Sequence, residues 1–329
     1  MASSWIAFFF LSLIFTVKTA SVYVDDVFHF DQQPDYMDRV LVAEPETAQN
    51  PLINQHKFTY IIDSQHCTPP TFLLVVVRSE PEHILERRDV RDTWGSVTSY
   101  RDKRIRTVFM TGHSKYPDNG LQQELLKENT LYGDIVVGDF VEHFRNQTYK
   151  SIMGLSWFDT HCEHADYVLM TNDETMVDPY HLIDFLLARE TGTSDKLLYC
   201  STLQDFAPSR NPSDKLFVTM KDYPYDTFPP HCDNMAFVMS GVTASQLLEA
   251  ARTVTSFWQD HVYVTGLLAL KANVTHTDMI DGHSYNIMQE EHINNDIGSS
   301  MFLSIEFRDQ KQHWSTAWNA IQRLHKQQP

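Results

Sequence analysis

Three short segments of this 329-residue chain carry side chains that could hold a phosphate, bind a metal ion or move a proton. The first is Tyr167–Val177 (YVLMTNDETMV), where an apolar run leads into Asn172, Asp173 and Glu174 and then returns to apolar residues. Burying carboxylates beside such a run is costly unless a cation or hydrogen-bond donors compensate for it. Oxygen ligands at a turn suit Mn²⁺ or Mg²⁺, and such an ion could hold phosphates. The alternative is a capped turn that leads into a helix after Pro179.

The second segment is Gln259–Gly266 (QDHVYVTG), which opens an expected helix with Asp260 and His261. Aspartate at a helix start is a common N-terminal cap, so Asp260 alone has an ordinary structural explanation. The adjacent His261 adds a side chain that can take up a proton near neutral pH. Together they form a candidate acid–base pair.

The third segment is Glu86–Trp94 (ERRDVRDTW), which contains both basic and acidic residues. On a helix, Arg87 and Arg91 are four residues apart and Arg88 and Arg91 three apart, so their guanidinium groups lie on adjoining faces. Such planar groups could grip a diphosphate or order a nearby acidic loop. The alternative is a solvated ion-pair network with the acidic residues of the same segment.

The composition narrows the class of protein. The chain has 42% hydrophobic and 21% charged residues, which is ordinary for a globular protein and excludes a wholly disordered chain. Its net charge of −17 and pI near 5.3 argue against general nucleic-acid binding. It has neither a GxGxxG fingerprint nor a GxxxxGK phosphate loop after its first expected strand, which disfavours nicotinamide or flavin enzymes and P-loop NTPases.

The apolar pattern from residue 72 onward predicts alternating strands and helices. The expected strands are Phe72–Val77, Arg106–Met110, Asp134–Val137, Tyr167–Met170, Leu197–Cys200, Ala236–Met239 and Phe302–Phe307. The expected helices are Glu82–Trp94, Leu121–Leu131, Thr148–Cys162, Pro179–Arg189, Thr243–Ala251, Tyr263–Leu270 and Lys311–Lys326. This alternation implies one α/β domain with a mostly parallel sheet flanked by helices. Ligands of such sheets bind at the carboxyl ends of the strands, where the Tyr167–Val177 segment places its polar residues.

The N-terminal segment directs the chain to the secretory pathway. Met1–Val17 has no charged side chain and ends in a 13-residue apolar run, shorter than the roughly 20 residues that span a bilayer and closer to a signal-peptide core. A cleaved signal peptide and an uncleaved signal anchor over residues 1–21 both remain open, and both deliver the chain to the lumen. Residues 22–66 are expected to form a stem or irregular lead-in, and residues 67–329 the folded domain.

Cysteine usage and glycosylation signals agree with that compartment. Asn146-Gln147-Thr148 and Asn273-Val274-Thr275 are acceptor triplets for N-glycosylation. The four cysteines contain no CxxC pair, so zinc-finger spacing is absent and two disulfides are expected in an oxidising lumen. Of the three possible pairings we favour Cys67–Cys162 and Cys200–Cys232; buried free thiols are the alternative.

Taken in order, these pieces resemble the β-1,3-glycosyltransferase family (glycosyltransferase family 31), which includes β-1,3-galactosyl- and N-acetylglucosaminyltransferases and is related to the Fringe enzymes. The resemblance covers roughly residues 67–318. The matching segments are Glu86–Gly95 (ERRDVRDTWG), Tyr132–Phe140 (YGDIVVGDF), Asn146–Cys162, Tyr167–Val177, Tyr223–Ser240 and Val262–Ala269.

This resemblance implies a GT-A-like fold and a Golgi type II membrane topology, with the N-terminal segment in the membrane if it is uncleaved. It further implies a UDP-sugar donor held with Mn²⁺ (or Mg²⁺) and an inverting single displacement. In that reaction a base deprotonates the acceptor hydroxyl while the metal stabilises the departing diphosphate. The expected product is a hexose, galactose or an N-acetylhexosamine, on the 3-hydroxyl of a glycan carried by a glycoprotein or glycolipid.

The family's site residues fall on identifiable positions of this chain. Its acidic trio falls on Asn172, Asp173 and Glu174, of which Asp173 and Glu174 would hold the metal and Asn172 and Asp173 the donor. Its acidic pair, which includes the base, falls on Asp260 and His261. The residues expected to support the diphosphate are Arg88, Arg91 and Lys150.

The chain also departs from the family's pattern at several of these positions. The trio is usually three aspartates, and here it reads Asn-Asp-Glu. The lysine usual two residues before the trio is replaced by Met170, and the second acid of the pair is replaced by His261. These substitutions motivate an alternative function, a catalytically silent lumenal protein that binds glycans or partner transferases.

Overall fold

The computed structural model describes residues 58–116, 120–189, 196–279, 285–287, 300–304 and 310–326. The expected signal peptide or anchor, and most of the expected stem, lie outside these described residues. Within them, every helix is too short or too polar to cross a membrane.

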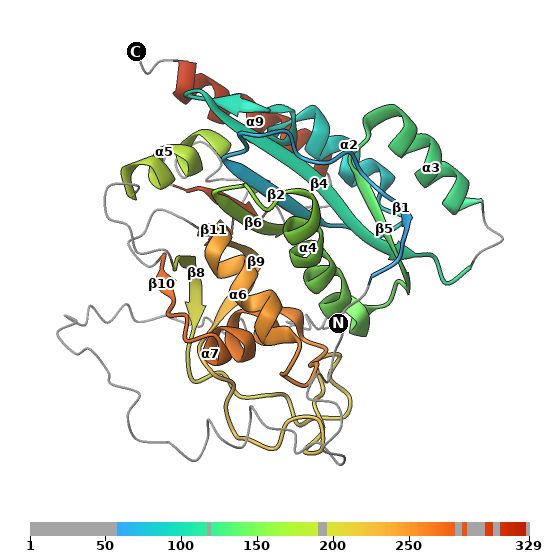
Figure 1. Ribbon diagram of the computed structural model, residues 1–329, viewed down its shortest axis with the longest axis vertical. Helices are drawn as coiled ribbons and strands as arrows, with labels where there is room; N and C mark the ends of the chain where they lie inside the picture. Colours follow the sequence, from blue (N-terminus) through green and yellow to red (C-terminus); the bar gives the residue numbers. More distant parts are fainter. Residues whose placement is uncertain are drawn as a thin grey trace, which may run out of the picture.

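A nine-stranded mixed sheet forms the centre of the described part of the chain (Figure 1). Its strands lie in the order β1-β5-β4-β2-β6-β9-β8-β10, and β3 pairs with β4 beside this path. Their bounds are β1 Tyr60–Ile62, β2 Leu73–Arg78, β3 Ser99–Tyr100, β4 Lys103–His113, β5 Ile135–Val141, β6 Tyr167–Asn172, β8 Leu198–Leu203, β9 His231–Ser240 and β10 Thr277–Asp278. Strands β5, β4, β2 and β6 are mutually parallel, whereas β1 and β9 run antiparallel to their neighbours. The expected mostly parallel α/β sheet is confirmed.

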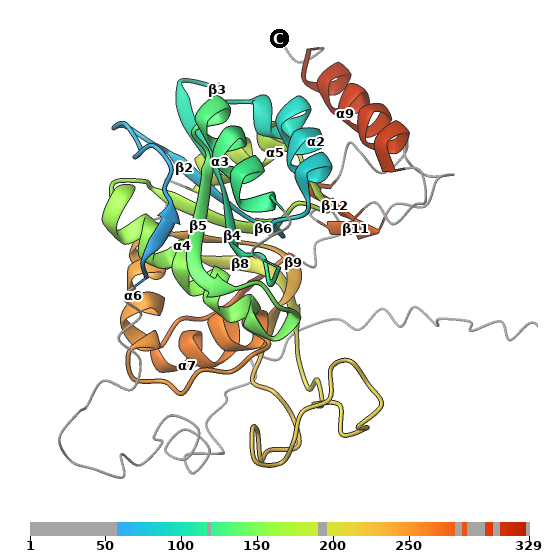
Figure 2. The same ribbon diagram turned by 90° about the vertical axis from the view of Figure 1, so that its right-hand side faces the viewer.

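Helices cover both faces of this sheet (Figure 2). One face carries α2, α3, α5 and α9, and the other carries α4, α6 and α7. Their bounds are α2 Ile84–Asp92, α3 Leu121–Tyr132, α4 Gln147–His161, α5 Pro179–Arg189, α6 Gly241–Ala251, α7 Ala269–Lys271 and α9 Gln310–Lys326. A π-helix, η5 (Val262–Leu268), leads into α7, and 3₁₀ turns η1 (Trp94–Ser96) and η3 (Phe144–Asn146) follow α2 and precede α4.

The strands divide their side chains between two hydrophobic cores. In β2 every residue is buried, as expected for a strand that is covered on both faces. Leu74 and Val76 pack with α4 and α6, whereas Leu73, Val75 and Val77 pack with α2, α3, α5 and α9. Successive residues of a strand point to opposite faces, so the FLLVVV run supplies both cores.

A second, three-stranded sheet lies after the acidic segment. It consists of β11 (Tyr285–Ile287), β12 (Phe302–Ser304) and β7 (Thr175–Val177), in that order. The buried residues of β7 pair with β12, and Asp178 then caps α5 by accepting hydrogen bonds from the backbone N–H groups of Tyr180 and His181, each at 3.0 Å. After the acidic residues, the chain therefore forms strand β7 before it reaches the capped start of α5.

Most expected elements are present, with shifted ends. The expected helix Tyr263–Leu270 is mainly the π-helix, and β9 begins at His231, five residues earlier than expected. Strand β1 lies inside the expected irregular lead-in and pairs with β5, so the sheet begins before Cys67. The end of the expected strand Phe302–Phe307 lies outside the described residues.

Both expected disulfides are confirmed. Cys67 is bonded to Cys162 and Cys200 to Cys232, which excludes buried free thiols. The first bond joins the segment before β2 to the end of α4, and the second joins the adjacent strands β8 and β9.

Candidate functional site

The candidate site lies where β2 and β6 end and β9 begins. In the sheet, Arg78 of β2 is paired in register with Asn172 of β6, and Thr171 of β6 is paired with Ala236 of β9. Polar side chains from the ends of these strands therefore share one edge with the first turns of α4 and with residues 259–261. Open α/β sheets bind their ligands at this kind of edge.

Arg78 is the centre of this edge and is only 5% exposed. Its guanidinium forms a buried ion pair with Asp260. It also donates to the carbonyl oxygen of Thr171, at 3.2 Å, and to the side-chain and backbone oxygens of Asn234. A single side chain thus joins β2, β6, β9 and the start of the π-helix segment.

Asp260 is held as a carboxylate by its neighbours. Burial alone raises the pKa of Asp260, but the charges of Arg78 and His261 and the hydrogen bond from Ser151 outweigh burial and hold the pKa far below its usual value. Ser151 Oγ donates to Asp260 Oδ2 at 2.8 Å, the same oxygen that Arg78 contacts. Asp260 therefore cannot readily take up a proton.

His261 lies beside Asp260 and has the more accessible side chain of the two. Its Nδ1 is 3.6 Å from Asp260 Oδ1, too long for a hydrogen bond, and makes no hydrogen bond to any described residue. Its side chain is 20% exposed, against 5% for Asp260. Nδ1 is thus the ring nitrogen that faces Asp260, and Nε2 is directed away from this carboxylate.

A second histidine, His231 at the start of β9, lies next to this pair. The centroids of the two imidazole rings are 5.6 Å apart. His231 Nδ1 lies 2.8 Å from the carbonyl oxygen of Pro229, and burial lowers the pKa of His231 to about 4. His231 is consequently neutral near pH 7 and adds no charge beside His261.

The acidic corner after β6 faces the start of α2. Asp173 is buried, and its Oδ2 is 3.0 Å from His83 Nδ1. This hydrogen bond raises the pKa of His83 to about 9, so the pair is a charged one. Asn172 Oδ1 accepts hydrogen bonds from the Glu174 N–H at 3.0 Å and from Thr175 Oγ1 at 2.8 Å. Asn172 therefore stabilises the turn, and its side-chain oxygen is already used in these two hydrogen bonds.

Glu174 is the exposed acid of this corner. Burial by the surrounding protein raises the pKa of Glu174, and the negative charges of Asp173, Glu80 and Glu86 raise it further, against the opposing charge of His83. Such an excess of negative charge is relieved when a cation binds. Since His83 uses only one oxygen of Asp173, the corner retains carboxylate oxygens that fit a divalent ion.

Lys150 lies on the other side of Arg78 and is 2% exposed. Its Nζ is 3.0 Å from Glu142 Oε1 and donates to the carbonyl oxygen of Ser79 at 3.0 Å. Glu142 Oε2 accepts in turn from the N–H of Gly112 in β4, at 3.0 Å. This charge-neutral pair fixes the turn that follows β2.

The arginines of α2 contact acids outside their own helix, as the interpretation of an ordered acidic loop expects. Arg91 is bound by Glu128 and Asp134 and stacks on the Tyr132 ring, 4.1 Å from its centroid. Arg87, fully buried, also pairs with Glu128, so both arginines join α2 to α3 rather than to acids of their own helix. The Arg91 guanidinium is already held by two carboxylates, and its expected role in donor binding stays a prediction. Arg88 is exposed.

The structure thus brings most of the expected residues to one edge. Asp173 donates its backbone N–H to the carbonyl oxygen of Arg78, at 3.3 Å, while the Arg78 side chain holds Asp260. Sequence reasoning missed Arg78, His83 and Ser151. Arg78 lies directly after an expected strand, and that position was the available signal; His83 lies at the start of the expected helix Glu82–Trp94.

Known proteins that are similar to this chain are glycosyltransferases. A family model described as "Galactosyltransferase" matches residues 86–280, more than half of the chain. The chain is 29% identical over 218 residues to human "Beta-1,3-galactosyltransferase 2", covering 66% of this chain and 52% of that protein. It is 31% identical over 207 residues to human "Beta-1,3-galactosyltransferase 5", covering 63% of this chain and 65% of that protein. It is 30% identical over 194 residues to "UDP-GalNAc:beta-1,3-N-acetylgalactosaminyltransferase 1" of Mus spicilegus, covering 59% and 58%. The match to the first of these relatives spans about half of its length.

Proposed function

This chain belongs to the galactosyltransferase family of β-1,3-glycosyltransferases, and we propose that it is a UDP-sugar-dependent, inverting hexosyltransferase. It would move galactose or an N-acetylhexosamine to the 3-hydroxyl of an acceptor glycan on a glycoprotein or glycolipid. One observation carries the proposal. Arg78 contacts the acidic corner through its backbone and Asp260 through its side chain, so a metal-binding acid and a base candidate share one strand end.

The donor is proposed to bind at the corner formed by residues 172–174. Asp173 and Glu174 would hold a divalent ion, Mn²⁺ or Mg²⁺, and the turn set by Asn172 presents them together. When bound, such an ion neutralises charge on a leaving diphosphate. The exposed Arg88 of α2 is proposed to contact the diphosphate. Lys150 is proposed as a positioning residue, because its charge is already paired with Glu142.

The base is proposed to be His261 rather than Asp260. Asp260 is bound by Arg78 and Ser151, and its pKa lies below the usual range, so it is a weak proton acceptor. Its second oxygen lies toward His261 Nδ1, which leaves Nε2 to take the proton of the acceptor hydroxyl. Asp260 then acts by orienting His261 and stabilising its charged form.

We further propose that this site works in the Golgi lumen, with the N-terminal segment as membrane anchor. Two disulfides support an oxidising compartment. Asn273 is exposed and suits a glycan, whereas Thr148 of the other acceptor triplet is buried and donates to the carbonyl oxygen of Phe257.

The test measures donor binding and transfer with the purified, glycosylated chain. We expect UDP to raise the melting temperature only when Mn²⁺ or Mg²⁺ is present, and one UDP-sugar of a panel to yield glycan product. Glu174→Ala should lose the metal-dependent stabilisation by UDP. His261→Ala should keep that stabilisation and lose transfer by a factor of about 10²–10⁴, the usual contribution of a general base.

Glu124→Ala is the matched control, because Glu124 is an exposed acid in the first turn of α3. It should behave as the unmodified chain in both assays. Absence of metal-dependent UDP stabilisation together with absence of transfer to any acceptor would instead establish the catalytically silent binding protein.

A further inference from the structure

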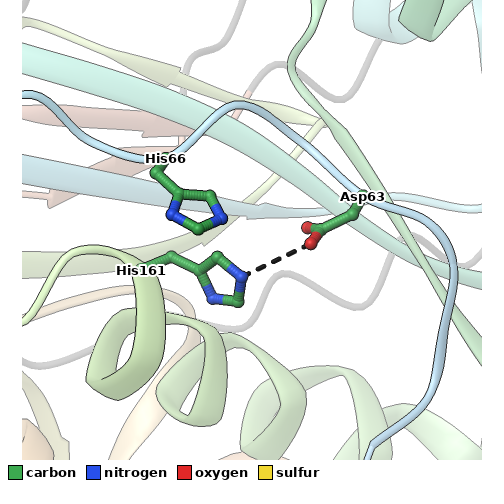
Figure 3. Close-up of side chains that lie close together, drawn as sticks. All are labelled: Asp63, His66 and His161. Carbon is green, nitrogen blue, oxygen red and sulfur yellow. Dashed lines mark ion pairs between the residues drawn. The ribbon is translucent and has the colours of Figure 1, made fainter.

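A cluster of two histidines and one aspartate lies away from the candidate site. Asp63 follows β1, His66 precedes the first disulfide, and His161 ends α4; their side chains converge (Figure 3). One ligand atom from each residue lies within 4.8 Å of the others. His161 is eleven residues along α4 from Lys150, which at 1.5 Å per residue places it roughly 16 Å from the site edge. We propose that Asp63, His66 and His161 form a zinc-binding site.

The disulfide holds the two histidines together. His66 directly precedes Cys67 and His161 directly precedes Cys162, and these cysteines are bonded with their Cα atoms 5.1 Å apart. The N–H of Cys67 also donates to the carbonyl oxygen of His161, at 3.1 Å. The ring centroids of His66 and His161 are 4.1 Å apart. A covalent bond therefore provides the closeness that a metal site otherwise has to obtain from folding.

Neighbouring groups orient the ligand atoms. Asp63 Oδ1 accepts hydrogen bonds from Trp157 Nε1 at 3.0 Å and from the Ser64 N–H at 2.8 Å, while Oδ2 lies 3.3 Å from His161 Nε2. On the far side of the His161 ring, Nδ1 is 2.5 Å from Thr160 Oγ1. Metal-binding imidazoles commonly use their second nitrogen in this way. The ring also stacks on Trp157, with an interplanar angle of 2°.

The ligand set favours zinc. Zn²⁺ binds imidazole and carboxylate in tetrahedral sites, and three protein ligands leave one position for water. Mg²⁺ and Mn²⁺ prefer oxygen ligands, so this nitrogen-rich cluster differs in metal preference from the acidic corner. Without a metal, the same residues form only an ion pair between His161 and Asp63 that joins β1 to α4.

The test titrates Zn²⁺ into the purified chain, stripped of metal and with its disulfides formed, against a chromogenic chelator. Co²⁺ serves as a spectroscopic probe, because its visible absorption reports tetrahedral nitrogen and oxygen ligation. We expect one tight equivalent of Zn²⁺, with affinity weakened at least about 100-fold in His66→Ala. Thr160→Val removes the hydroxyl beside His161 Nδ1 and no metal ligand, and should weaken the affinity about 10–100-fold. Affinity should also fall on acidification, because imidazole must be neutral to bind the ion.

Two controls separate this site from others. His113→Ala removes a histidine that also lies beside an aspartate, 4.0 Å from Asp139, and should leave Zn²⁺ binding unchanged. Glu174→Ala should also leave it unchanged, so the result is independent of the proposed transferase function. Equal Zn²⁺ affinity in the unmodified chain and His66→Ala, absence of binding, or loss of binding only in Glu174→Ala would each overturn the proposal. Because His66 is exposed, its substitution should leave the fold intact, which circular dichroism checks.

Discussion

Replacing Arg78 by methionine should destabilise the protein strongly. The variant leaves Asp260 buried without its ion-pair partner and removes the donors to Thr171 and Asn234. Removing one partner of a buried pair costs about 3–5 kcal/mol, a large part of a typical unfolding free energy. With a urea m-value of about 3 kcal/mol/M, the midpoint of unfolding should fall by roughly 1 M or more. Tryptophan fluorescence and circular dichroism, with coincident transitions, measure this at pH 7.

The pH dependence gives this prediction a sign. In the unmodified chain the pKa of Asp260 is lowered, so its pairing stabilises the fold above pH 4 and that contribution is lost as pH falls. In Arg78→Met burial remains and the main opposing charge is gone, so the pKa of Asp260 should rise above the unfolded value. The unfolding free energy of the variant then decreases as pH rises. The difference in unfolding free energy between the unmodified chain and the variant should therefore become smaller when the pH is lowered from 7 to 4. Adding Asp260→Asn should recover part of the loss.

A surface ion pair provides the control. Arg101 pairs with Asp184 at 2.7 Å, but its side chain is 56% exposed. Arg101→Met should leave the midpoint unchanged within error, because solvent screens such pairs. The proposed stabilising role of the contacts between Arg78 and Asp260, Thr171 and Asn234 is refuted if the urea midpoint of Arg78→Met lies within about 0.3 M of that of the unmodified chain at pH 7.

Two further predictions concern His231 and the disulfides. Because burial lowers the pKa of His231 to about 4, the unmodified chain should lose up to about 1.4 kcal/mol per pH unit from this residue between pH 6.5 and 4. His231→Gln should flatten that slope in urea titrations at several pH values, and an unchanged slope would contradict it. Replacing both cysteines of Cys67–Cys162, 95 residues apart, should cost about 4.7 kcal/mol, against about 3.7 for Cys200–Cys232, 32 residues apart. Unfolding of the two double-alanine variants tests this order, and the reverse order would show that native-state packing outweighs chain entropy.

The apolar pattern was sufficient to predict the sheet but insufficient to predict the site. The run at residues 72–77 required a strand covered on both faces, and the structure has one there. Arg78, the last residue of β2, contacts Asn234 and Asp260, which lie 156 and 182 residues away in the sequence. The residues next to Arg78 in the sequence do not indicate which distant acid its side chain contacts in the fold. The acidic corner was predictable because its residues are contiguous, whereas Arg78 and His83 act through contacts that only the folded chain creates.

The helix before α7 shows a second limit of sequence patterns. Val262–Leu268 is apolar enough to predict a buried helix, but the apolar pattern does not distinguish a π-helix from an α-helix. A side chain at Gly266 would lie 3.1 Å from Pro229 Cγ and 3.2 Å from His231 Cβ, so this segment lies tightly against the start of β9. Single π-helical segments occur often at functional sites, and this one begins directly after His261.

The histidine at position 261 is consistent with the charges around it. In the family's pattern two neighbouring acids share this place, and like charges raise the pKa of one of them, which suits a base. Here the charge of Asp260 is matched by the single charge of Arg78, and the neighbouring His231 is neutral. A second carboxylate would leave this buried edge with an unmatched negative charge, whereas an imidazole brings no negative charge. Under the proposed function, histidine in place of the second acid would therefore supply a proton acceptor beside Asp260 without adding a negative charge to this edge.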